Sequence, residues 1–237
     1  MPSYFTSDVH LRLDHPERGQ RFARWVQSLE ADDRLTIVGD LCDFWFAARQ
    51  THTALAECPG LLALADFRAR GGTLTILPGN HDAWLGPYYE TMLGARFVPE
   101  PLTIQDHGLS LFLIHGQWLG GHPVWKGWLE SRAFLATFRR LPSRLAATFD
   151  HLLERRNNRS SQGDDLRQLT AYRQYVKTLT ATTDIAIIGH IHRSSDDHDS
   201  QPRLIVPGGW IGQSSHVRVD SSGAALFVDK SPIPITC

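Results

Sequence analysis

The sequence predicts a single α/β domain in which parallel strands alternate with helices. Its 237 residues are 42% hydrophobic, which is ample for one sizeable core. Short runs rich in Ile, Val and Leu end at Gly, Pro or a polar residue and predict strands, and helical stretches lie between the early ones. Strands that alternate with helices favour parallel pairing through right-handed crossovers.

The expected elements follow in chain order. Strands are predicted over Ser3–Ser7, Leu35–Val38, Thr73–Leu77, Leu109–Ile114, Asp184–Ile188, Leu204–Val206, Val217–Val219 and Ala224–Val228. Helices are expected over Glu17–Leu29 and Gly60–Arg70, and Gly71-Gly72 provides a stop signal for the second one.

The segment from about residue 122 to residue 180 reads differently. It lacks strand alternation and has helix-compatible apolar spacing, with Pro142 expected to separate two helices. A third helix is expected over Asp164–Thr180. We interpret this segment as a helical insertion, here called the lid, within one domain that spans residues 1–237.

Charge and cysteine content limit the classes of partner and compartment. The formal net charge is −1, so no dedicated nucleic-acid partner is expected. The stretch His122–Lys177 nevertheless carries eleven Lys/Arg and five Asp/Glu, a net charge of +6. Three cysteines without a CxxC pair favour a reducing cytoplasm. With neither a signal-like start nor a long apolar run, we expect a cytoplasmic protein, with peripheral contact to an anionic inner membrane through the lid.

Metal-ligand residue types follow five of the apolar runs directly. The strings are Asp8-Val9-His10, Gly39-Asp40-Leu41-Cys42-Asp43, Gly79-Asn80-His81-Asp82, His115-Gly116 and Gly189-His190-Ile191-His192. In parallel sheets, ligands gather at the carboxyl ends of the strands, so these side chains are expected to converge.

The spacing of these residues indicates two metal ions. Asp8 and His10 are two residues apart on a strand, so they can hold one ion together, with His192. Asn80, His115 and His190 would hold a second ion, and Asp40 can bridge the two because a carboxylate has two oxygens. Mixed carboxylate, amide and imidazole ligands suit Mn²⁺, Fe or Zn²⁺. Such a pair lowers the pKa of a bridging water to about 7, so a metal-bound hydroxide would be the nucleophile.

His81 is the expected general acid. It follows the ligand Asn80 but points elsewhere if Asn80 faces the ions, so it can protonate the departing oxygen or stabilise charge on it. Asp43 is the preferred residue to orient the His81 imidazole, and Asp82 is the alternative.

On these residues the sequence resembles the calcineurin-like metallophosphoesterase superfamily. The pattern Asp-x-His, Gly-Asp-x-x-Asp, Gly-Asn-His-Asp, His-Gly, Gly-His-x-His runs across most of the chain. The resemblance implies a β-sandwich flanked by helices, two divalent ions of the Mn²⁺ type, and His81 as the catalytic histidine.

Within that superfamily the chain resembles the UDP-2,3-diacylglucosamine hydrolases of lipid A synthesis. The resemblance rests on residues 39–46 and 79–84, on the insertion after His115-Gly116, and on Pro207-Gly208-Gly209-Trp210-Ile211. It implies hydrolysis of a UDP-diacyl sugar to UMP and a lipid monophosphate at a membrane surface. Two positions depart from the usual pattern: Gln117 replaces an acidic residue, and His81 stands where many members have Arg.

The lid offers the expected substrate contacts. Its aromatic residues can cover acyl chains, and its arginines can bind phosphate bidentately. The expected contacts are Trp125, Trp128, Arg155, Arg156, Arg159 and Ser160. The alternative is a cap whose aromatics pack on the sheet and whose arginines are solvated. For Trp210, core packing and substrate contact are both open.

Two other functions are compatible with the motifs. The first is another phosphodiesterase, a phosphomonoesterase or a nuclease of the same superfamily. The second is a metal-binding scaffold without catalysis, which the apparently complete set of ligands and His81 disfavours.

Overall fold

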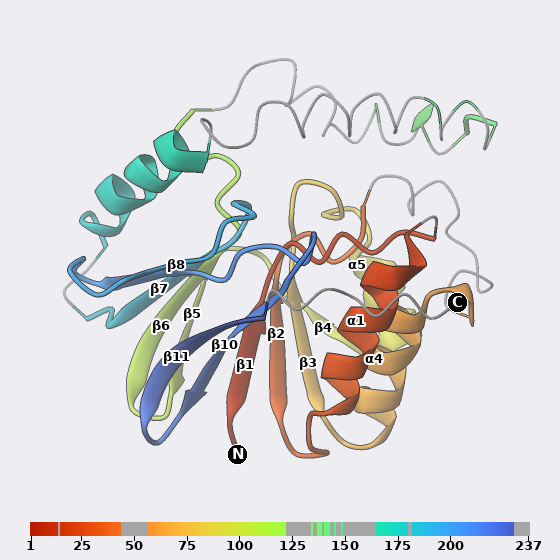
Figure 1. The fold of residues 1–237 in the computed structure, drawn as a ribbon, viewed down its shortest axis with the longest axis horizontal. Coiled ribbons are helices and arrows are strands. Elements are labelled where there is room, and N and C mark those ends of the chain that lie inside the picture. Colours follow the sequence, from red (N-terminus) through yellow and green to blue (C-terminus); the bar gives the residue numbers. More distant parts are fainter. Residues whose placement is uncertain are drawn as a thin grey trace.

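Two β-sheets pack face to face, and helices cover their outer faces (Figure 1). The computed structural model describes residues 1–13, 15–43, 56–121, 165–179 and 182–229, with scattered residues between 134 and 148. The β-sandwich flanked by helices that the sequence led us to expect is therefore confirmed.

The first sheet has six strands in the order β11-β10-β1-β2-β3-β4. Their bounds are β1 Ser3–Thr6, β2 Arg34–Val38, β3 Thr73–Leu77, β4 Arg96–Phe97, β10 Ser214–Asp220 and β11 Gly223–Asp229. Strands β1 to β4 pair in parallel, and β10 joins β1 antiparallel.

The second sheet has five strands in the order β5-β6-β7-β9-β8. Their bounds are β5 Leu102–Asp106, β6 Leu109–Ile114, β7 Ile185–Ile188, β8 Ser195–Asp197 and β9 Arg203–Val206. Strands β6, β7 and β9 are parallel, and β5 and β8 form antiparallel edges. The parallel pairing predicted from strand–helix alternation is thus confirmed in both sheets.

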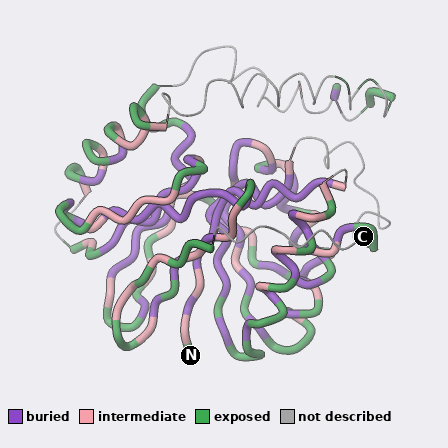
Figure 2. Tube along the Cα trace, in the orientation of Figure 1, coloured by how far each residue is buried: buried purple, intermediate pink, exposed green. Residues whose placement is uncertain are grey.

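Strand β7 shows how one strand contributes to two cores. Ile185 and Ile187 point toward the first sheet and pack in the cluster between the sheets. Ala186 and Ile188 point the other way and pack beneath the helical residues 165–176. Because alternate side chains face opposite sides of a sheet, a strand covered on both faces is apolar throughout. Figure 2 shows this continuous burial along the central strands.

Helices α1 (Pro16–Gln27), α4 (Pro59–Ala69) and α5 (Gly86–Leu93) lie along the first sheet. Each has proline in its first turn, where the missing backbone N–H costs nothing. Helices α1 and α4 bury Phe22, Val26 and Leu64 against the outer face of this sheet. Helix α4 ends before Gly71-Gly72, as predicted.

All eight predicted strands are found, with boundary differences of up to three residues. The structure adds α5, β4, β5 and β8, which the sequence analysis did not assign. Residues 165–176 form a helix inside the third predicted lid helix. The first two lid helices fall largely outside the described residues. Within the described part of the chain, no helix is both long enough and apolar enough to cross a membrane.

Candidate metal centre

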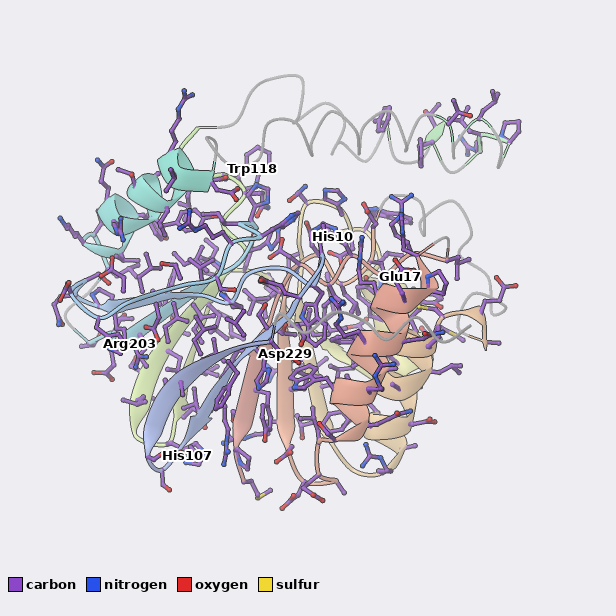
Figure 3. The ribbon with its side chains drawn as sticks, in the orientation of Figure 1. His10, Glu17, His107, Trp118, Arg203 and Asp229 are labelled. Atoms are coloured by element: carbon purple, nitrogen blue, oxygen red, sulfur yellow. The ribbon has the colours of Figure 1, made fainter. Side chains whose placement is uncertain are left out.

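The five sequence strings converge at one edge of the sandwich. Each follows a parallel strand directly: β1, β2 and β3 in the first sheet, and β6 and β7 in the second. Backbone hydrogen bonds join the loops, including Asp8 N to Gly39 O at 3.2 Å and His10 N to Asp40 O at 3.0 Å. All seven expected metal ligands lie among the described residues, and His10 is labelled in Figure 3.

Asp8, His10 and His192 form the first cluster of candidate ligands. His10 Nε2 and His192 Nε2 are 3.1 Å apart, and each lies 3.7 Å from Asp8 Oδ1. Bonds of about 2.1 Å that meet at roughly 90–110° place ligand atoms about 3.0–3.4 Å apart. The 3.1 Å between the two imidazole nitrogens lies in this range, and the 3.7 Å from each to Asp8 Oδ1 corresponds to a wider angle of about 124°, so one cation could contact all three atoms.

Asp40, Asn80, His115 and His190 form the second cluster. His115 Nε2 lies 3.4 Å from Asp40 Oδ2 and 3.2 Å from Asn80 Oδ1. His190 lies with Asp40 and His115 in a group whose ligand atoms are all within 4.8 Å of one another. Asp40 Oδ2 is also 3.8 Å from His10 Nε2, so this one oxygen faces both clusters.

Each carboxylate divides its two oxygens between the backbone and the site. Asp8 Oδ2 accepts the His190 N–H at 2.8 Å, and Asp40 Oδ1 accepts the His81 N–H at 2.8 Å. Asp8 Oδ1 is fully buried and accepts no hydrogen bond from the described residues. A buried carboxylate oxygen without a donor is costly unless a cation neutralises it, so this orphaned atom also fits a metal ligand.

The backbone at these ligands is strained. Asp8, His10, Asp40 and His190 all have positive φ, between 50° and 68°. Non-glycine residues rarely occupy this left-handed region, and each such residue costs about 1–3 kcal/mol. The surrounding loops hold this strain, which aims the side chains of consecutive strand ends at one point.

Desolvation disfavours charge on two imidazoles. It lowers the pKa of the half-buried His190 to about 3, and the neighbouring His115 acts in the same direction. The pKa of His192 is lowered to about 4 by desolvation and by His10, although 42% of its side chain is exposed. At His115, burial also disfavours charge, but the Asp40 carboxylate outweighs it and raises the pKa to about 10. Neutral imidazole is the form that binds metal, so binding at His115 would release a proton.

The structure places Asp43 against His81, as preferred from the sequence. His81 Nδ1 and Asp43 Oδ1 are 2.6 Å apart, and Arg12 donates to Asp43 Oδ2 at 3.2 Å. Burial opposes ionisation of Asp43, yet His81, His10 and Arg12 hold its pKa well below its usual range.

Asp82, the alternative partner, lies elsewhere. Its fully buried carboxylate accepts hydrogen bonds from Leu41 N at 2.8 Å, Gly79 N at 3.0 Å and the Tyr89 hydroxyl at 2.8 Å. It thereby joins the loop that carries Asp40 to the loop that carries Asn80.

Sequence reasoning missed Glu100, which precedes β5. Its carboxylate accepts His115 N at 2.6 Å through Oε2 and Gln117 Nε2 at 3.1 Å through Oε1. The resemblance led us to expect an acid at position 117; in the structure Gln117 faces a carboxylate that comes from a different segment. An isolated Glu before Pro carries no sequence signal of this role.

Trp210 belongs to the core. Its side chain is fully buried, packs edge-on against Phe22 and donates from Nε1 to Thr6 Oγ1 at 2.8 Å. Core packing, one of the two predictions left open, is what the structure shows. The predicted substrate residues Trp125, Trp128, Arg155, Arg156, Arg159 and Ser160 lie outside the described residues.

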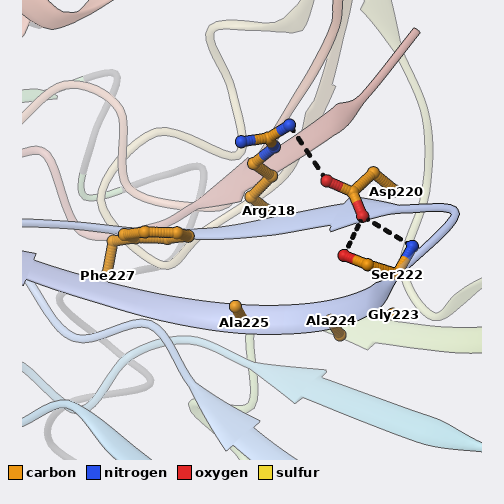
Figure 4. Close-up of a pocket in the computed structure, with 7 residues that line it drawn as sticks. All are labelled: Arg218, Asp220, Ser222, Gly223, Ala224, Ala225 and Phe227. Atoms are coloured by element: carbon orange, nitrogen blue, oxygen red, sulfur yellow. Dashed lines mark hydrogen bonds and ion pairs between the residues drawn. The ribbon is translucent and has the colours of Figure 1, made fainter.

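A shallow pocket on the β10–β11 hairpin is separate from this centre (Figure 4). Arg218 and Asp220 form an ion pair of 3.0 Å on its wall. Because Ser3 pairs with Val219, the hairpin turn lies at the amino end of β1, whereas Asp8 follows its carboxyl end.

Comparisons with known proteins agree with the fold and the motifs. A UDP-2,3-diacylglucosamine hydrolase of Xanthomonas axonopodis pv. citri (strain 306) is 29% identical, over 95% of this chain and 98% of that one. A protein of the same name from Nitrosococcus oceani is 30% identical, over 89% and 88%. The crystal structure of a hypothetical protein from Pyrococcus horikoshii OT3 superposes with a TM-score of 0.52 at 9% identity. The match covers 99% of this chain and 89% of that one and shows a similar fold. Residues 1–194 match the family model for calcineurin-like phosphoesterases, so the chain belongs to this family of metal-dependent phosphoester hydrolases.

Proposed function

We propose that this chain hydrolyses the pyrophosphate bond of a UDP-diacylglucosamine-like substrate to UMP and a lipid sugar 1-phosphate. The observation that carries the proposal is that two clusters of candidate ligands meet at Asp40 Oδ2, beside the hydrogen-bonded pair His81–Asp43. The choice of substrate is supported by relatives named UDP-2,3-diacylglucosamine hydrolase that are similar along 95% of this chain.

The ligand set is suited to two divalent ions. Asp8, His10 and His192 would hold one, Asn80, His115 and His190 the other, and Asp40 would contact both. Carboxylate, amide and imidazole donors suit Mn²⁺, which we propose as the native ion, and the same donors accept Fe or Zn²⁺. When bound, such ions neutralise phosphate charge and activate water as a nucleophile.

His81 is the proposed general acid. Asp43 engages Nδ1, so the ring is oriented with Nε2 as the atom that delivers a proton to the departing phosphate oxygen. Arg12 in turn fixes the other oxygen of Asp43, and the His81 ring lies against His10 with centroids 4.9 Å apart. The imidazole is thus held beside the first cluster of ligands.

The lid, residues 122–180, would bind the rest of the substrate within the same domain. Its net charge of +6 between His122 and Lys177 complements phosphates and an anionic membrane surface. Arg155, Arg156, Arg159 and Ser160 are the proposed phosphate contacts, and Trp125 and Trp128 the proposed acyl contacts. Sheltering acyl chain is worth about 0.8 kcal/mol per CH₂. These features favour action on the cytoplasmic face of a membrane.

A direct assay tests the proposal. The full chain with Mn²⁺ and UDP-2,3-diacylglucosamine in mixed micelles should release UMP, measured by chromatography with absorbance detection. Asp40→Asn should abolish release, and Asp32→Asn, an exposed acid in the turn before β2, should not.

Cleavage of other substrates in place of UDP-2,3-diacylglucosamine would contradict the proposal. If no UMP appears while a generic phosphodiester or single-stranded DNA is cleaved, the substrate proposal is wrong and the second candidate, another phosphodiesterase or nuclease, replaces it. The basic lid is the observation that favours this candidate.

A further inference from the structure

The helix at residues 165–176 belongs to the last part of the lid and packs on the second sheet near the candidate metal centre. Tyr172 and Val176 lie on its inner face and are fully buried against Ile188, Ile191 and Leu204. In Figure 1 this helix lies beside β7 and β8, on the side of the sandwich where the ligand loops gather. The helix is therefore a direct physical link between the lid and the site.

The Tyr172 hydroxyl reaches two ligand-bearing loops. Its oxygen lies 3.1 Å from the Gly189 carbonyl and 3.4 Å from the Gly116 carbonyl. Gly189 immediately precedes His190, and Gly116 immediately follows His115. One phenolic proton therefore serves both loops, with the shorter contact at Gly189.

The peptide group between Gly189 and His190 connects Tyr172 to a third loop, the one that contains Asp8. Its carbonyl accepts from Tyr172, and its N–H donates to Asp8 Oδ2 at 2.8 Å. Hydrogen bonds arranged in series polarise and strengthen one another in a buried environment. With Oδ2 engaged, Asp8 directs Oδ1 at His10 and His192, at 3.7 Å from each.

The orientation of this peptide needs an external restraint. His190 has φ of 68°, a backbone conformation that residues with a side chain rarely adopt. The absence of a side chain at Gly116 makes room for the hydroxyl, since a Cβ at this position would lie only 3.0 Å from it. Burial, followed by the nearby Asp8 charge, raises the pKa of the Tyr172 phenol well above its usual value, so it stays a donor.

We propose that Tyr172 is a positioning residue of the metal centre, which holds the Gly189–His190 peptide and through it Asp8 in ligand geometry. The inference rests on the proposed metal site and adds a link from the lid helix to that site. Second-layer partners of metal ligands typically change metal affinity about 10–100-fold when they are removed.

Tyr172→Phe tests the inference because it removes the hydroxyl and keeps the ring. Tyr175→Phe is the matched control: it lies on the same helix, packs on Phe112 with ring centroids 6.1 Å apart, and its hydroxyl has no hydrogen bond within the described part of the chain. Mn²⁺ binding is measured by calorimetry for the wild type and both variants. We expect binding to weaken about 10-fold or more in Tyr172→Phe and to be unchanged in Tyr175→Phe.

The outcomes separate this inference from the metal centre itself. If the wild type binds Mn²⁺ and Tyr172→Phe binds it equally well, the inference is overturned and the metal centre stands. A wild type that takes up no Mn²⁺ would overturn both.

A second measurement uses only the wild-type chain, in case the variant does not fold. If the hydroxyl helps to position the ligands, bound Mn²⁺ must by linkage stabilise the helix contact. Hydrogen exchange in residues 165–176 should then slow on addition of Mn²⁺ by more than exchange in α4 does. Equal slowing in both helices would overturn the inference.

Discussion

Asp43 and His81 are joined by a hydrogen bond of 2.6 Å between Asp43 Oδ1 and His81 Nδ1. Arg12, which is almost fully buried, donates to the second oxygen of the same carboxylate at 3.2 Å. The carboxylate is therefore fixed from two sides, and it fixes the imidazole in turn. As the proposed general acid, an imidazole positioned in this way would contribute about 10²–10⁴-fold to rate.

Asp43→Asn should lower kcat by about 10²-fold or more, because an amide cannot stabilise the charged imidazole. At saturating Mn²⁺ the Mn²⁺ content should stay at the wild-type value, since Asp43 belongs to neither ligand cluster and its Oδ2 lies 4.0 Å from Nδ1 of the ligand His10. Steady-state kinetics and metal analysis on the same preparation check both statements, with Asp32→Asn as the control. Unchanged kcat would remove Asp43 from the proposed mechanism.

Glu100 and Gln117 provide a charge-swap experiment. Gln117→Glu leaves two carboxylates face to face, so this variant disturbs His115. Glu100→Gln keeps a matched pair, because one amide can donate to the other. We expect Gln117→Glu to weaken Mn²⁺ binding about 10-fold, and the double variant Glu100→Gln/Gln117→Glu to regain most of the loss because a donor again faces an acceptor. Calorimetric Mn²⁺ titration measures the cycle. An equal loss in the double variant would show that the pair does not position His115.

Chelation should destabilise the protein by mass action. A ligand that binds only the folded state adds about 2.7 kcal/mol at 100 times its Kd. Thermal unfolding in excess Mn²⁺ should therefore occur at a higher Tm than in EDTA, and His115→Ala should reduce the difference. His198→Ala serves as the control, because His198 lies on the surface beside Asp196. Equal Tm values with and without Mn²⁺ for the wild type would argue against specific uptake.

His216 predicts a pH dependence of stability away from the metal centre. Burial, with a smaller effect of Arg218, lowers the pKa of His216 from 6.5 to about 4. The His216 ring stacks on the Phe227 ring with an interplanar angle of 9°. Between pH 4 and pH 6.5 the unfolded chain binds a proton here and the folded chain does not. The contribution to stability is thus fully present above pH 6.5 and is lost as the pH falls toward 4.

His216→Phe keeps the stack and removes this proton. Its free energy of unfolding, measured in urea, should fall less than that of the wild type between pH 6.5 and pH 4. Parallel pH profiles for the two proteins would refute the assignment.

The sequence predicted the candidate metal ligands better than the residues that surround and support them. Asp8, Asp40 and His190 each follow a strand that reads clearly as apolar, so strand assignment alone predicted their convergence. Glu100 and Tyr172 could not be found this way. Both contact backbone groups in distant loops, and no local pattern in the sequence reports such contacts.

The same limit applies to short elements. Strand β4 has two residues and β8 has three, too few for an alternation to be recognised. Asp82 differs from these elements because the sequence motif identifies the residue but not its contacts. Its carboxylate joins two loops by accepting hydrogen bonds from Leu41 N and Gly79 N. The sequence favoured Asp43 over Asp82 as the partner of His81, and Asp43 is the acid that contacts the His81 ring.

Metal stoichiometry tests the central claim most directly. Protein dialysed to equilibrium in excess Mn²⁺ and analysed by mass spectrometry should hold two ions per wild-type chain, and about one when His115 is replaced by Ala. A wild-type chain that holds no Mn²⁺, or that holds as much as its Asp8→Ala/Asp40→Ala variant, would contradict the two-ion site.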